Sequence, residues 1–168
     1  MVENASEDVE VLGTHPMFGP SVRSVRGQTV ILVKPEGRTG ELSRRVEGEL
    51  RDSGANVQYA TAEEHDEMMS VVQGLTHYAY IAVGGALERI DFEVDESRRF
   101  MSPVYEIMLD FVGRILHQNP YLYAEIQANQ PVERVHDALL DSAEELARSV
   151  DEEDVEGFVD EMRDAARH

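Results

Sequence analysis

The fold is decided at residues 61–87, TAEEHDEMMSVVQGLTHYAYIAVGGAL, where the pattern of the chain changes from strands to helices. Thr61 and Glu64 form a capping box, and the acidic residues around them favour the positive end of a helix dipole. Apolar residues then recur at helical spacing to the end of the stretch. These features predict one long helix. Gly84 and Gly85 lie inside it and predict close packing against another helix.

The residues that follow predict more helices. Ser102-Pro103 predicts a helix start, because proline is favoured at the first helical position. We expect that helix to end before Asn119-Pro120 and a short helix to follow at 120–129. Pro131 opens the next predicted helix, and residues 152–167 form a last amphipathic segment. We therefore expect an all-helical domain at residues 61–168.

The N-terminal part, residues 1–60, has the pattern of a β-α-β unit. Val9–Leu12 alternates like a short strand, and Thr29–Val33 is a β-branched run typical of a strand covered on both faces. A helix is expected at residues 40–53 and a further strand at Val57–Tyr59. Such a run predicts a parallel edge of a sheet. Because two or three strands do not make a stable sheet alone, we expect further strands upstream.

The charge balance limits the classes of partner. The chain has 34 acidic and 15 basic residues, a formal net charge of -19, and Lys34 is its only lysine. Such a chain repels phosphate backbones, which argues against nucleic-acid binding. A disordered acidic tail is excluded because 42% of the residues are hydrophobic and recur periodically. An acidic, lysine-poor surface suits molar salt, where the Debye length falls to roughly 3 Å, and predicts a halophilic, haloarchaeal-like protein.

Other aspects of the composition indicate the compartment. The chain has no cysteine, which excludes disulfides and thiolate metal sites and is compatible with a reducing cytosol. It has no run of 18 apolar residues that would span a membrane. We therefore expect a cytoplasmic protein with no membrane partner.

A few ionisable residues inside apolar segments are candidates for chemistry. His15 precedes a proline at the margin of the predicted sheet, where α/β folds place ligands, but that signal alone is weak. His77 lies in an apolar helix, where a histidine is more often a core residue than a catalyst. Arg114 follows Asp110 by four residues, which is also the spacing of a surface ion pair. The acidic run at 63–67 is better explained by a helix start than by a metal site.

Several motifs favour a functional interpretation of these residues, because they resemble those of the prephenate dehydrogenases and occur in the same order. The first motif, GTHPMFGP at Gly13–Pro20, resembles a signature that follows a late strand of the family's dinucleotide-binding domain. The other matching segments are Glu64-His65-Asp66, Leu75-Thr76-His77, Ser102–Tyr105, Val112–Arg114 and Asn119–Ile126. The resemblance covers nearly the whole chain, from about residue 9 to residue 168.

The resemblance implies a fold and a reaction. The fold is mainly helical: the terminal β-α-β part of a Rossmann-type dinucleotide-binding domain, residues 1–60, precedes a helical dimerisation and substrate domain, residues 61–168. The reaction is the oxidative decarboxylation of prephenate to 4-hydroxyphenylpyruvate in tyrosine biosynthesis, with hydride passing to NAD or NADP. The expected assembly is a homodimer formed through the helical domain.

The same resemblance assigns roles to four residues. His15 matches the catalytic histidine that accepts a hydrogen bond from the substrate 4-hydroxyl. Arg114 matches an arginine that binds a substrate carboxylate, and His77 a histidine of the substrate pocket. His65 matches another histidine of the substrate site, one that acts behind the residues touching the substrate. Arg23, Arg98 and Arg99 are further candidates for a basic pocket.

Two departures from the family pattern limit the prediction. No GxGxxG motif follows a strand, so we expect no cofactor-binding residues here, and a chain that by itself binds neither NAD nor NADP and is inactive. Glu106 stands where some relatives carry an arginine, which puts a second basic contact in doubt. Two alternatives stay open: an arogenate dehydrogenase of the same fold, and a non-catalytic dimerisation or regulatory module.

Overall fold

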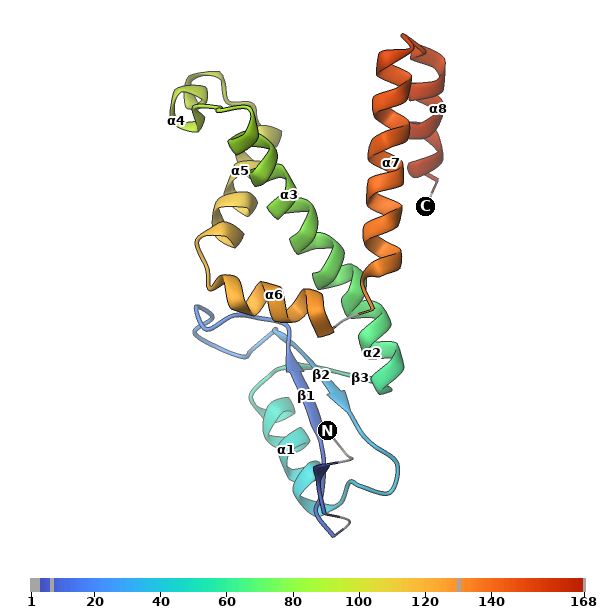
Figure 1. The fold of residues 1–168 in the computed structure, drawn as a ribbon. Coiled ribbons are helices and arrows are strands. Elements are labelled where there is room, and N and C mark those ends of the chain that lie inside the picture. Colours follow the sequence, from blue (N-terminus) through green and yellow to red (C-terminus); the bar gives the residue numbers. More distant parts are fainter. Residues whose placement is uncertain (1–3, 7, 130, 168) are drawn as a thin grey trace. The chain divides into compact units, whose positions relative to one another are not determined.

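The computed structural model describes residues 4–6, 8–129 and 131–167 (Figure 1). The chain divides into two compact units, the first ending at Met68 and the second beginning at Met69. The first unit holds a small sheet and the second is helical. The division at residue 60 that the sequence suggests stays a prediction.

The first unit contains a three-stranded sheet in the order β1-β2-β3. β1 (Gly13–Pro16) is antiparallel to β2 (Thr29–Val33), and β2 is parallel to β3 (Asn56–Ala60). Helix α1 (Glu41–Asp52) connects the two parallel strands. The predicted β-α-β run with its parallel pair is therefore confirmed.

The predicted strand at Val9–Leu12 is wrong, because the first strand begins at Gly13. These residues make other contacts. The Val11 amide donates to the Arg38 carbonyl oxygen at 2.8 Å, and the Glu10 carboxylate reaches the start of α1. The alternating pattern therefore reflects a segment that packs beside the sheet without pairing in it.

Burial on β2 also differs from the prediction. Val30 and Leu32 are 2% and 0% exposed and form a core with Val57, whereas the alternate residues of the strand are only partly buried. Within the residues that the structure describes, β2 is thus fully covered on one face, and the prediction of a strand covered on both faces is wrong.

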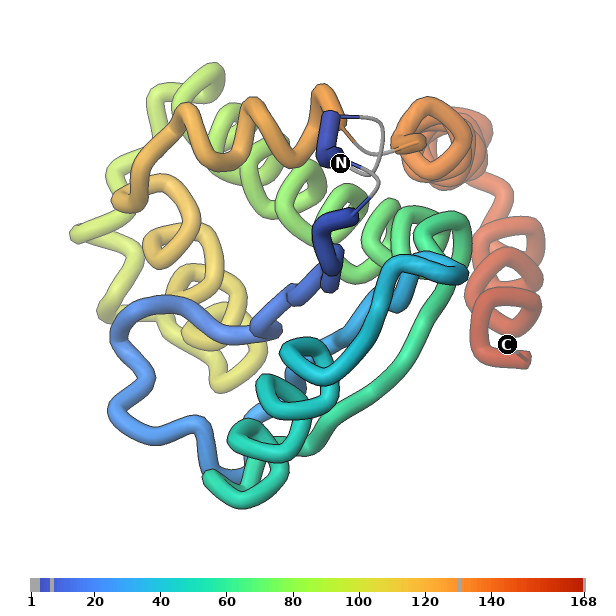
Figure 2. The backbone as a smooth tube through the Cα atoms, turned by 90° about the horizontal axis from the view of Figure 1, so that it is seen from below, coloured from blue at the N-terminus to red at the C-terminus, as the bar shows by residue number. Residues whose placement is uncertain are grey.

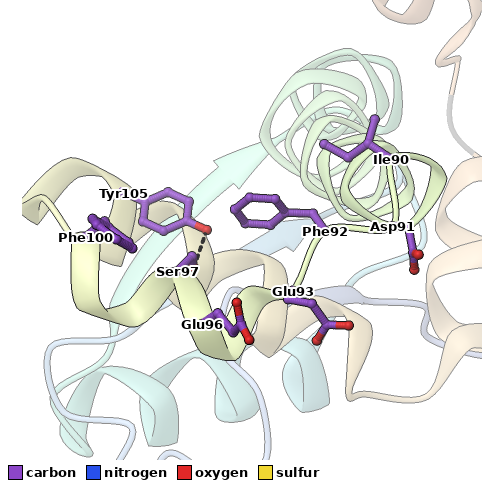
Figure 3. Close-up of a pocket in the computed structure, with 8 residues that line it drawn as sticks. All are labelled: Ile90, Asp91, Phe92, Glu93, Glu96, Ser97, Phe100 and Tyr105. Atoms are coloured by element: carbon purple, nitrogen blue, oxygen red, sulfur yellow. Dashed lines mark hydrogen bonds between the residues drawn. The ribbon is translucent and has the colours of Figure 1, made fainter.

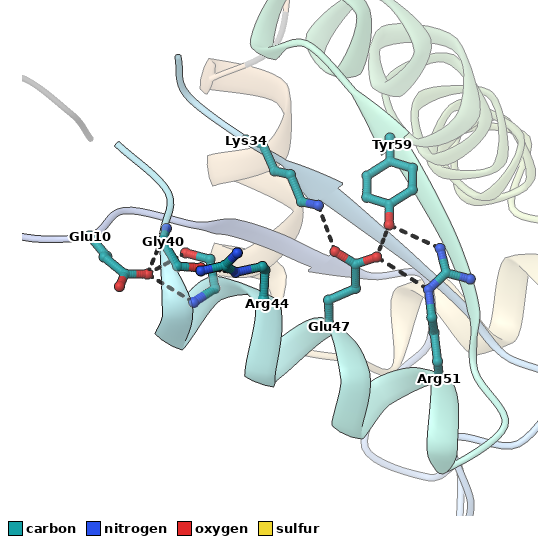
Figure 4. Close-up of polar contacts among 8 residues, drawn as sticks. Glu10, Lys34, Gly40, Arg44, Glu47, Arg51 and Tyr59 are labelled. Carbon is teal, nitrogen blue, oxygen red and sulfur yellow. Dashed lines mark hydrogen bonds and ion pairs between the residues drawn. The ribbon is translucent and has the colours of Figure 1, made fainter. Parts of the chain in front are cut away.

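A polar cluster joins β2, α1 and β3 (Figure 4). The Glu47 carboxylate on α1 accepts from the Lys34 ammonium, the Tyr59 hydroxyl and the Arg51 guanidinium, whose Nε lies 3.2 Å away. The Lys34 ammonium also lies 4.5 Å from the centroid of the Tyr59 ring. The only lysine of the chain therefore serves an internal contact. The hydrogen bond from Lys34, followed by that from Tyr59, lowers the pKa of Glu47 to about 2.

A second carboxylate, Glu10, caps helix α1. Its oxygens accept from the backbone amides of Gly40 at 2.9 Å, Leu42 at 3.2 Å and Ser43 at 2.9 Å. The Ser43 hydroxyl donates a further bond at 2.9 Å. These bonds, led by the Ser43 amide, lower the pKa of Glu10 to about 2. The first turn of α1 is therefore tied to the chain that precedes β1.

We predict that the first unit loses stability in acid because of these two carboxylates. Their pKa values are lower in the folded chain than the ordinary 4.5, so their contribution is present above pH 4.5 and is lost as the pH falls through about 2. Hydrogen exchange of the β2 amides measures this loss. Glu10→Gln and Glu47→Gln should exchange faster than the wild type at pH 6 and show a smaller acid-induced increase. The control Glu49→Gln, on the exposed side of α1, should follow the wild type; equal curves for all the variants would contradict the prediction.

Helices fill the second unit and the end of the first. α2 (Ala62–Met69) is followed in the chain by a π-helical segment, η2 (Ser70–Leu75), and then by α3 (Thr76–Arg89). The remaining elements are α4 (Val94–Ser97), the 3-10 turn η3 (Arg98–Phe100), α5 (Pro103–Leu116), α6 (Pro120–Asn129), α7 (Glu133–Asp151) and α8 (Val155–Ala165). The α7–α8 pair forms a hairpin, seen side by side in Figure 1 and Figure 2.

The helix starts predicted at Thr61 and Ser102 agree with the structure, whereas α7 begins at Glu133 and not at Pro131, and α8 begins at Val155 and not at residue 152. The Thr61 and Glu64 capping box forms: the Thr61 amide donates to the Glu64 carboxylate at 2.9 Å, and the Glu64 amide to the Thr61 hydroxyl at 3.1 Å. Ser102 caps α5, with Pro103 as its first residue. The single helix predicted at 61–87 contains the π-helical segment, which the sequence pattern did not indicate. The short elements α4 and η3 were also not predicted.

Two glycines allow helices of the second unit to approach closely. A Cβ at Gly84 on α3 would lie 2.6 Å from Leu116 Cδ1 of α5, which confirms close packing at this position. A Cβ at Gly85 would meet nothing within 4 Å in the described structure, so the same prediction is wrong there. A Cβ at Gly74 in η2 would lie 2.6 Å from Cγ1 of Val132, at the start of α7.

Gln127 of α6 connects three other elements of the second unit. Its amide nitrogen donates to the Gly74 carbonyl oxygen of η2 at 3.0 Å, and its amide oxygen accepts from His136 Nε2 of α7 at 2.9 Å. The His136 ring stacks on Tyr78 of α3, with 4.0 Å between ring centroids. This network binds a carbonyl of the π-helical segment, where the regular helical hydrogen bonding is interrupted.

Candidate active site

The first group of predicted site residues lies in the first unit. His15 is the third residue of β1, opposite Ile31 of β2, and its side chain is partly buried. His15 Nδ1 lies 2.8 Å from His65 Nε2 of α2. The two rings meet edge to face, with their centroids 5.0 Å apart and an interplanar angle of 60°. Two predicted site residues that are far apart in sequence are thus hydrogen-bonded.

A carboxylate continues this arrangement. His65 Nδ1 lies 2.8 Å from Asp66 Oδ1, so the three side chains form a line from β1 into α2. The capping box at Thr61 and Glu64 holds the first turn of α2, which presents His65. Asp66 was not predicted as a site residue, although it stands in the motif that carries His65.

The environment keeps His15 in its neutral form. Burial lowers the pKa of His15 below the ordinary value, and the neighbouring His65 lowers it further. A neutral imidazole near neutral pH can accept a proton. His15 therefore has the protonation state that a general base requires.

The second group lies in the second unit. The His77 ring on α3 meets the ring of Tyr123 on α6 edge to face, with centroids 4.8 Å apart and an angle of 88°. His77 Nδ1 is buried and has no hydrogen-bond partner among the residues that the structure describes. Burial lowers the pKa of His77, so it too is neutral. A buried nitrogen without a partner is costly, and a ligand that bonds it would remove that cost.

Arg114 of α5 belongs to the same group. Burial raises the pKa of the Tyr123 hydroxyl, and the charge of Arg114 opposes this rise. In the described residues no ion pair joins Arg114 to Asp110, so the bland interpretation as a surface pair is wrong. The arginine is exposed and available to an anion. Tyr123, only 8% exposed, was missed by the sequence analysis.

Three further arginines were predicted as candidates for a basic pocket. Arg98 pairs with Asp95 at 3.2 Å, and the Arg99 guanidinium lies 5.6 Å from the centroid of the Phe100 ring. Both belong to the short η3 turn. Arg23 is exposed in the loop between β1 and β2. The part of these arginines in a basic pocket therefore stays a prediction.

A hollow of about 440 Å³ lies at the end of α3 (Figure 3). Ser97 and Tyr105 are hydrogen-bonded in it, with 2.8 Å between their hydroxyl oxygens. The lining residues are Ile90, Asp91, Phe92, Glu93, Glu96, Ser97, Phe100 and Tyr105. Its three carboxylates disfavour an anionic ligand, and none of the predicted site residues lines it.

The described residues do not fit the pyrophosphate of a dinucleotide. In parallel β-α units a phosphate binds at the helix N-terminus that follows the strand. Between β2 and β3 that helix is α1, and its first amides already bond the Glu10 carboxylate. The chain also lacks a GxGxxG motif. A dinucleotide would have to be held by other residues.

No helix in the part of the chain that the structure describes is both long and apolar enough to cross a membrane. In the same residues no group of three or more potential metal-ligating side chains occurs. The acidic run at 63–67 instead forms the start of α2.

Fold and site define a class of protein in which a helical domain follows strands of an α/β sheet, and a strand histidine, His15, is hydrogen-bonded to a helix histidine, His65. Residues 61–164 match the prephenate dehydrogenase dimerization domain. The chain belongs to the prephenate dehydrogenase family. The predicted fold class, with the end of a Rossmann-type domain before a helical domain, is thereby confirmed.

Individual relatives agree with this assignment. A protein described as a probable arogenate/prephenate dehydrogenase of Methanocaldococcus jannaschii is 43% identical over 170 residues, which cover 100% of this chain and 38% of that protein. The T-protein of Enterobacter agglomerans is 36% identical over 122 residues, covering 73% of this chain and 32% of that protein. The match thus spans about a third of the length of these relatives.

A solved structure shares the fold. The crystal structure of prephenate dehydrogenase from A. aeolicus in complex with hydroxyphenyl propionate and NAD+ superposes with a TM-score of 0.69 at 21% sequence identity. The match covers 92% of this chain and 56% of that chain.

Proposed function

We propose that this chain supplies the catalytic histidine and the helical substrate-binding part of a prephenate dehydrogenase of tyrosine biosynthesis. The reaction is the oxidative decarboxylation of prephenate to 4-hydroxyphenylpyruvate, with NAD or NADP as oxidant. The proposal rests on the hydrogen-bonded pair of His15 and His65 in a chain of this family. Because the dinucleotide does not fit the residues described, the chain acts together with a dinucleotide-binding region, and the 168 residues alone are inactive.

His15 is the base in this proposal. When the C4 centre of prephenate is oxidised, its hydroxyl becomes a carbonyl and its proton must leave. The neutral imidazole of His15 takes that proton. Carbon dioxide then leaves, the electron pair of the broken C–C bond passes through the ring to the C4 oxygen, and this oxygen takes a proton back as the ring becomes aromatic. For this step the protein mainly supplies alignment.

Arg114 and His77 bind the dianionic substrate. A guanidinium bonds a carboxylate through two parallel N–H groups, a geometry that lysine does not reproduce. Arg114 is suited to this because it has no ion pair among the described residues. His77 presents a buried Nδ1 that lacks a partner in the described structure. That both residues and His15 converge on one substrate is part of the proposal.

The assembly we propose is a homodimer through the helical unit. Apolar side chains on one stripe of α5 are exposed: Val104 by 78%, Ile107 by 57% and Phe111 by 44%. A stripe of this kind is typical of a surface that another helix covers.

The dimer is tested by sedimentation in molar KCl. The chain should sediment at twice 18.9 kDa, and Ile107→Asp should shift it toward the monomer. Glu106→Gln, a polar change on the next residue, is the control and should leave the mass unchanged. A monomeric wild type would contradict the proposal.

The acidic surface leads us to propose a halophilic, cytoplasmic enzyme. With a net charge of -19, the chain repels a dianion at low ionic strength, and salt screens this repulsion. Activity should therefore rise with KCl concentration up to the molar range.

An activity assay of the complete enzyme tests the function and separates the two substrates. Prephenate, with NAD or NADP in molar KCl, should be converted to 4-hydroxyphenylpyruvate and carbon dioxide. Arogenate is assayed in parallel because the M. jannaschii relative is named for both substrates. The 168-residue chain alone is the control and should give no turnover. Turnover of arogenate but not of prephenate would make arogenate the substrate. Turnover of neither compound would overturn the proposed function and favour a non-catalytic dimerisation or regulatory module.

A further inference from the structure

The hydrogen bonds that join Asp66, His65 and His15 restrict which ring nitrogens of the two histidines carry hydrogen. We propose that Asp66 is a positioning residue that acts through His65 to set which ring nitrogen of His15 is the base, namely Nε2. Only the role of Nε2 as the proton acceptor rests on the proposed function. It is argued from the two hydrogen bonds of 2.8 Å that join the three side chains.

The carboxylate of Asp66 determines which nitrogen of His65 carries hydrogen. An ionised carboxylate accepts hydrogen bonds and has none to donate. Asp66 Oδ1 lies 2.8 Å from His65 Nδ1, so this nitrogen must carry the hydrogen. When His65 is neutral, its imidazole has one N–H, and its lone pair is then at Nε2.

The second step transfers this constraint to His15. The lone pair of His65 Nε2 faces His15 Nδ1 at 2.8 Å, so His15 Nδ1 must be the donor. Neutral His15 then has its lone pair at Nε2. Without the carboxylate, His65 is free to carry its hydrogen on Nε2, which would turn His15 Nδ1 into the acceptor and Nε2 into a donor that cannot take a proton.

The same line also stabilises the protonated base. When His15 gains a proton at Nε2, both of its nitrogens carry hydrogen, and the Nδ1–H continues to donate to His65. Of the groups whose contacts with His15 are described, His65 is the titratable one, and Asp66 is the carboxylate on His65. The Asp66 side chain is 52% exposed, which weakens its effect on the charge.

The experiment compares Asp66→Ala with Glu63→Ala in the complete enzyme. Both variants remove one carboxylate from the first turns of α2, but only Asp66 bonds His65. For histidines that bind a metal, losing the outer hydrogen-bond partner typically costs 10- to 100-fold, and we take the lower end of that range for this exposed carboxylate. We expect kcat of Asp66→Ala to fall about tenfold with KM for prephenate within about twofold, and Glu63→Ala to match the wild type. Asp66→Asn should recover part of the loss, because its amide oxygen still accepts from His65 Nδ1.

Two further readouts exclude a merely structural effect. The acid limb of the kcat profile should move to lower pH in Asp66→Ala, because the carboxylate that favours the protonated pair is gone. The ¹⁵N spectrum of histidine-labelled enzyme should show His15 Nε2 without hydrogen in the wild type and a mixture of tautomers in Asp66→Ala. A wild-type His15 that carries its hydrogen on Nε2, or an Asp66→Ala variant with unchanged kcat and spectrum, would overturn the inference.

The outcome also separates this inference from the proposed function. The tautomer of His15 is read without any reaction. If His15 has the proposed tautomer but a variant without its ring keeps full turnover, the proposal that His15 is the base is contradicted, and the proposal that Asp66 sets the tautomer is not. If turnover depends on His15 while its tautomer is the opposite one, only the positioning fails.

Discussion

His15→Asn in the complete enzyme should lower kcat by roughly 10³-fold, because general-base catalysis by a positioned side chain contributes about 10²- to 10⁴-fold. Asparagine keeps a hydrogen-bonding oxygen of similar reach, so prephenate should still bind. It does not take a proton at neutral pH, so the hydroxyl of C4 loses its base. Steady-state kinetics give kcat, and a binding titration with prephenate gives the dissociation constant separately.

The pH profile adds a second check on this assignment. His15 must be neutral to act, and burial together with His65 lowers its pKa below 6.5. Activity of the wild type should therefore persist below pH 6.5 and fall only as the pH drops through the lowered pKa. The matched control is His117→Asn, an exposed histidine whose Nδ1 bonds the Gly113 carbonyl of its own helix at 2.8 Å. A kcat that His15→Asn leaves unchanged, or loss of prephenate binding as large as the loss of kcat, would remove His15 as the base.

The fold was predictable wherever one local signal decides an element. Ser102-Pro103 and Asn119-Pro120 mark the starts of α5 and α6, because proline is favoured at the first helical position. The strand at Val9–Leu12 was misjudged because an alternating pattern reports burial on one side, and Val11 is buried outside the ladder. The π-helical segment at Ser70–Leu75 was not predicted, because the spacing of apolar residues does not report which carbonyl each backbone amide bonds.

The sequence motifs named candidate site residues, but they did not predict the contacts that these residues make. His15 and His65 came from separate motifs that are 50 residues apart, and no local pattern states that a strand residue will meet a helix residue. Tyr123 was missed because a tyrosine on an apolar helix has the signature of a core residue. We count it with the candidate site because its ring meets that of His77 and the charge of Arg114 reaches it, and both come from other helices.

Arg114→Ala should raise KM for prephenate by about 10- to 100-fold, since hydrogen bonds to charged groups contribute about 1.5–3 kcal/mol. The guanidinium has no ion pair among the described residues, so its loss leaves no protein carboxylate unpaired there, and the chain should fold as before. The substrate, in contrast, loses a partner for one of its two negative charges in a protein of net charge -19. Steady-state kinetics in molar KCl measure the change.

Arg114→Lys and Arg148→Ala separate geometry from charge in this test. Lysine keeps the positive charge but does not form two parallel bonds, so its KM should lie between those of the wild type and the alanine variant. Arg148, exposed on α7, carries the same charge in the same unit, and its removal should leave KM unchanged if binding depends on position. Equal KM values for all the variants would show that the carboxylate is held elsewhere. A guanidinium that binds one carboxylate of the substrate acts only from its own place in the fold. An equal rise in KM for Arg114→Ala and Arg148→Ala would therefore mean that the net charge of the protein, and not the position of Arg114, determines substrate binding.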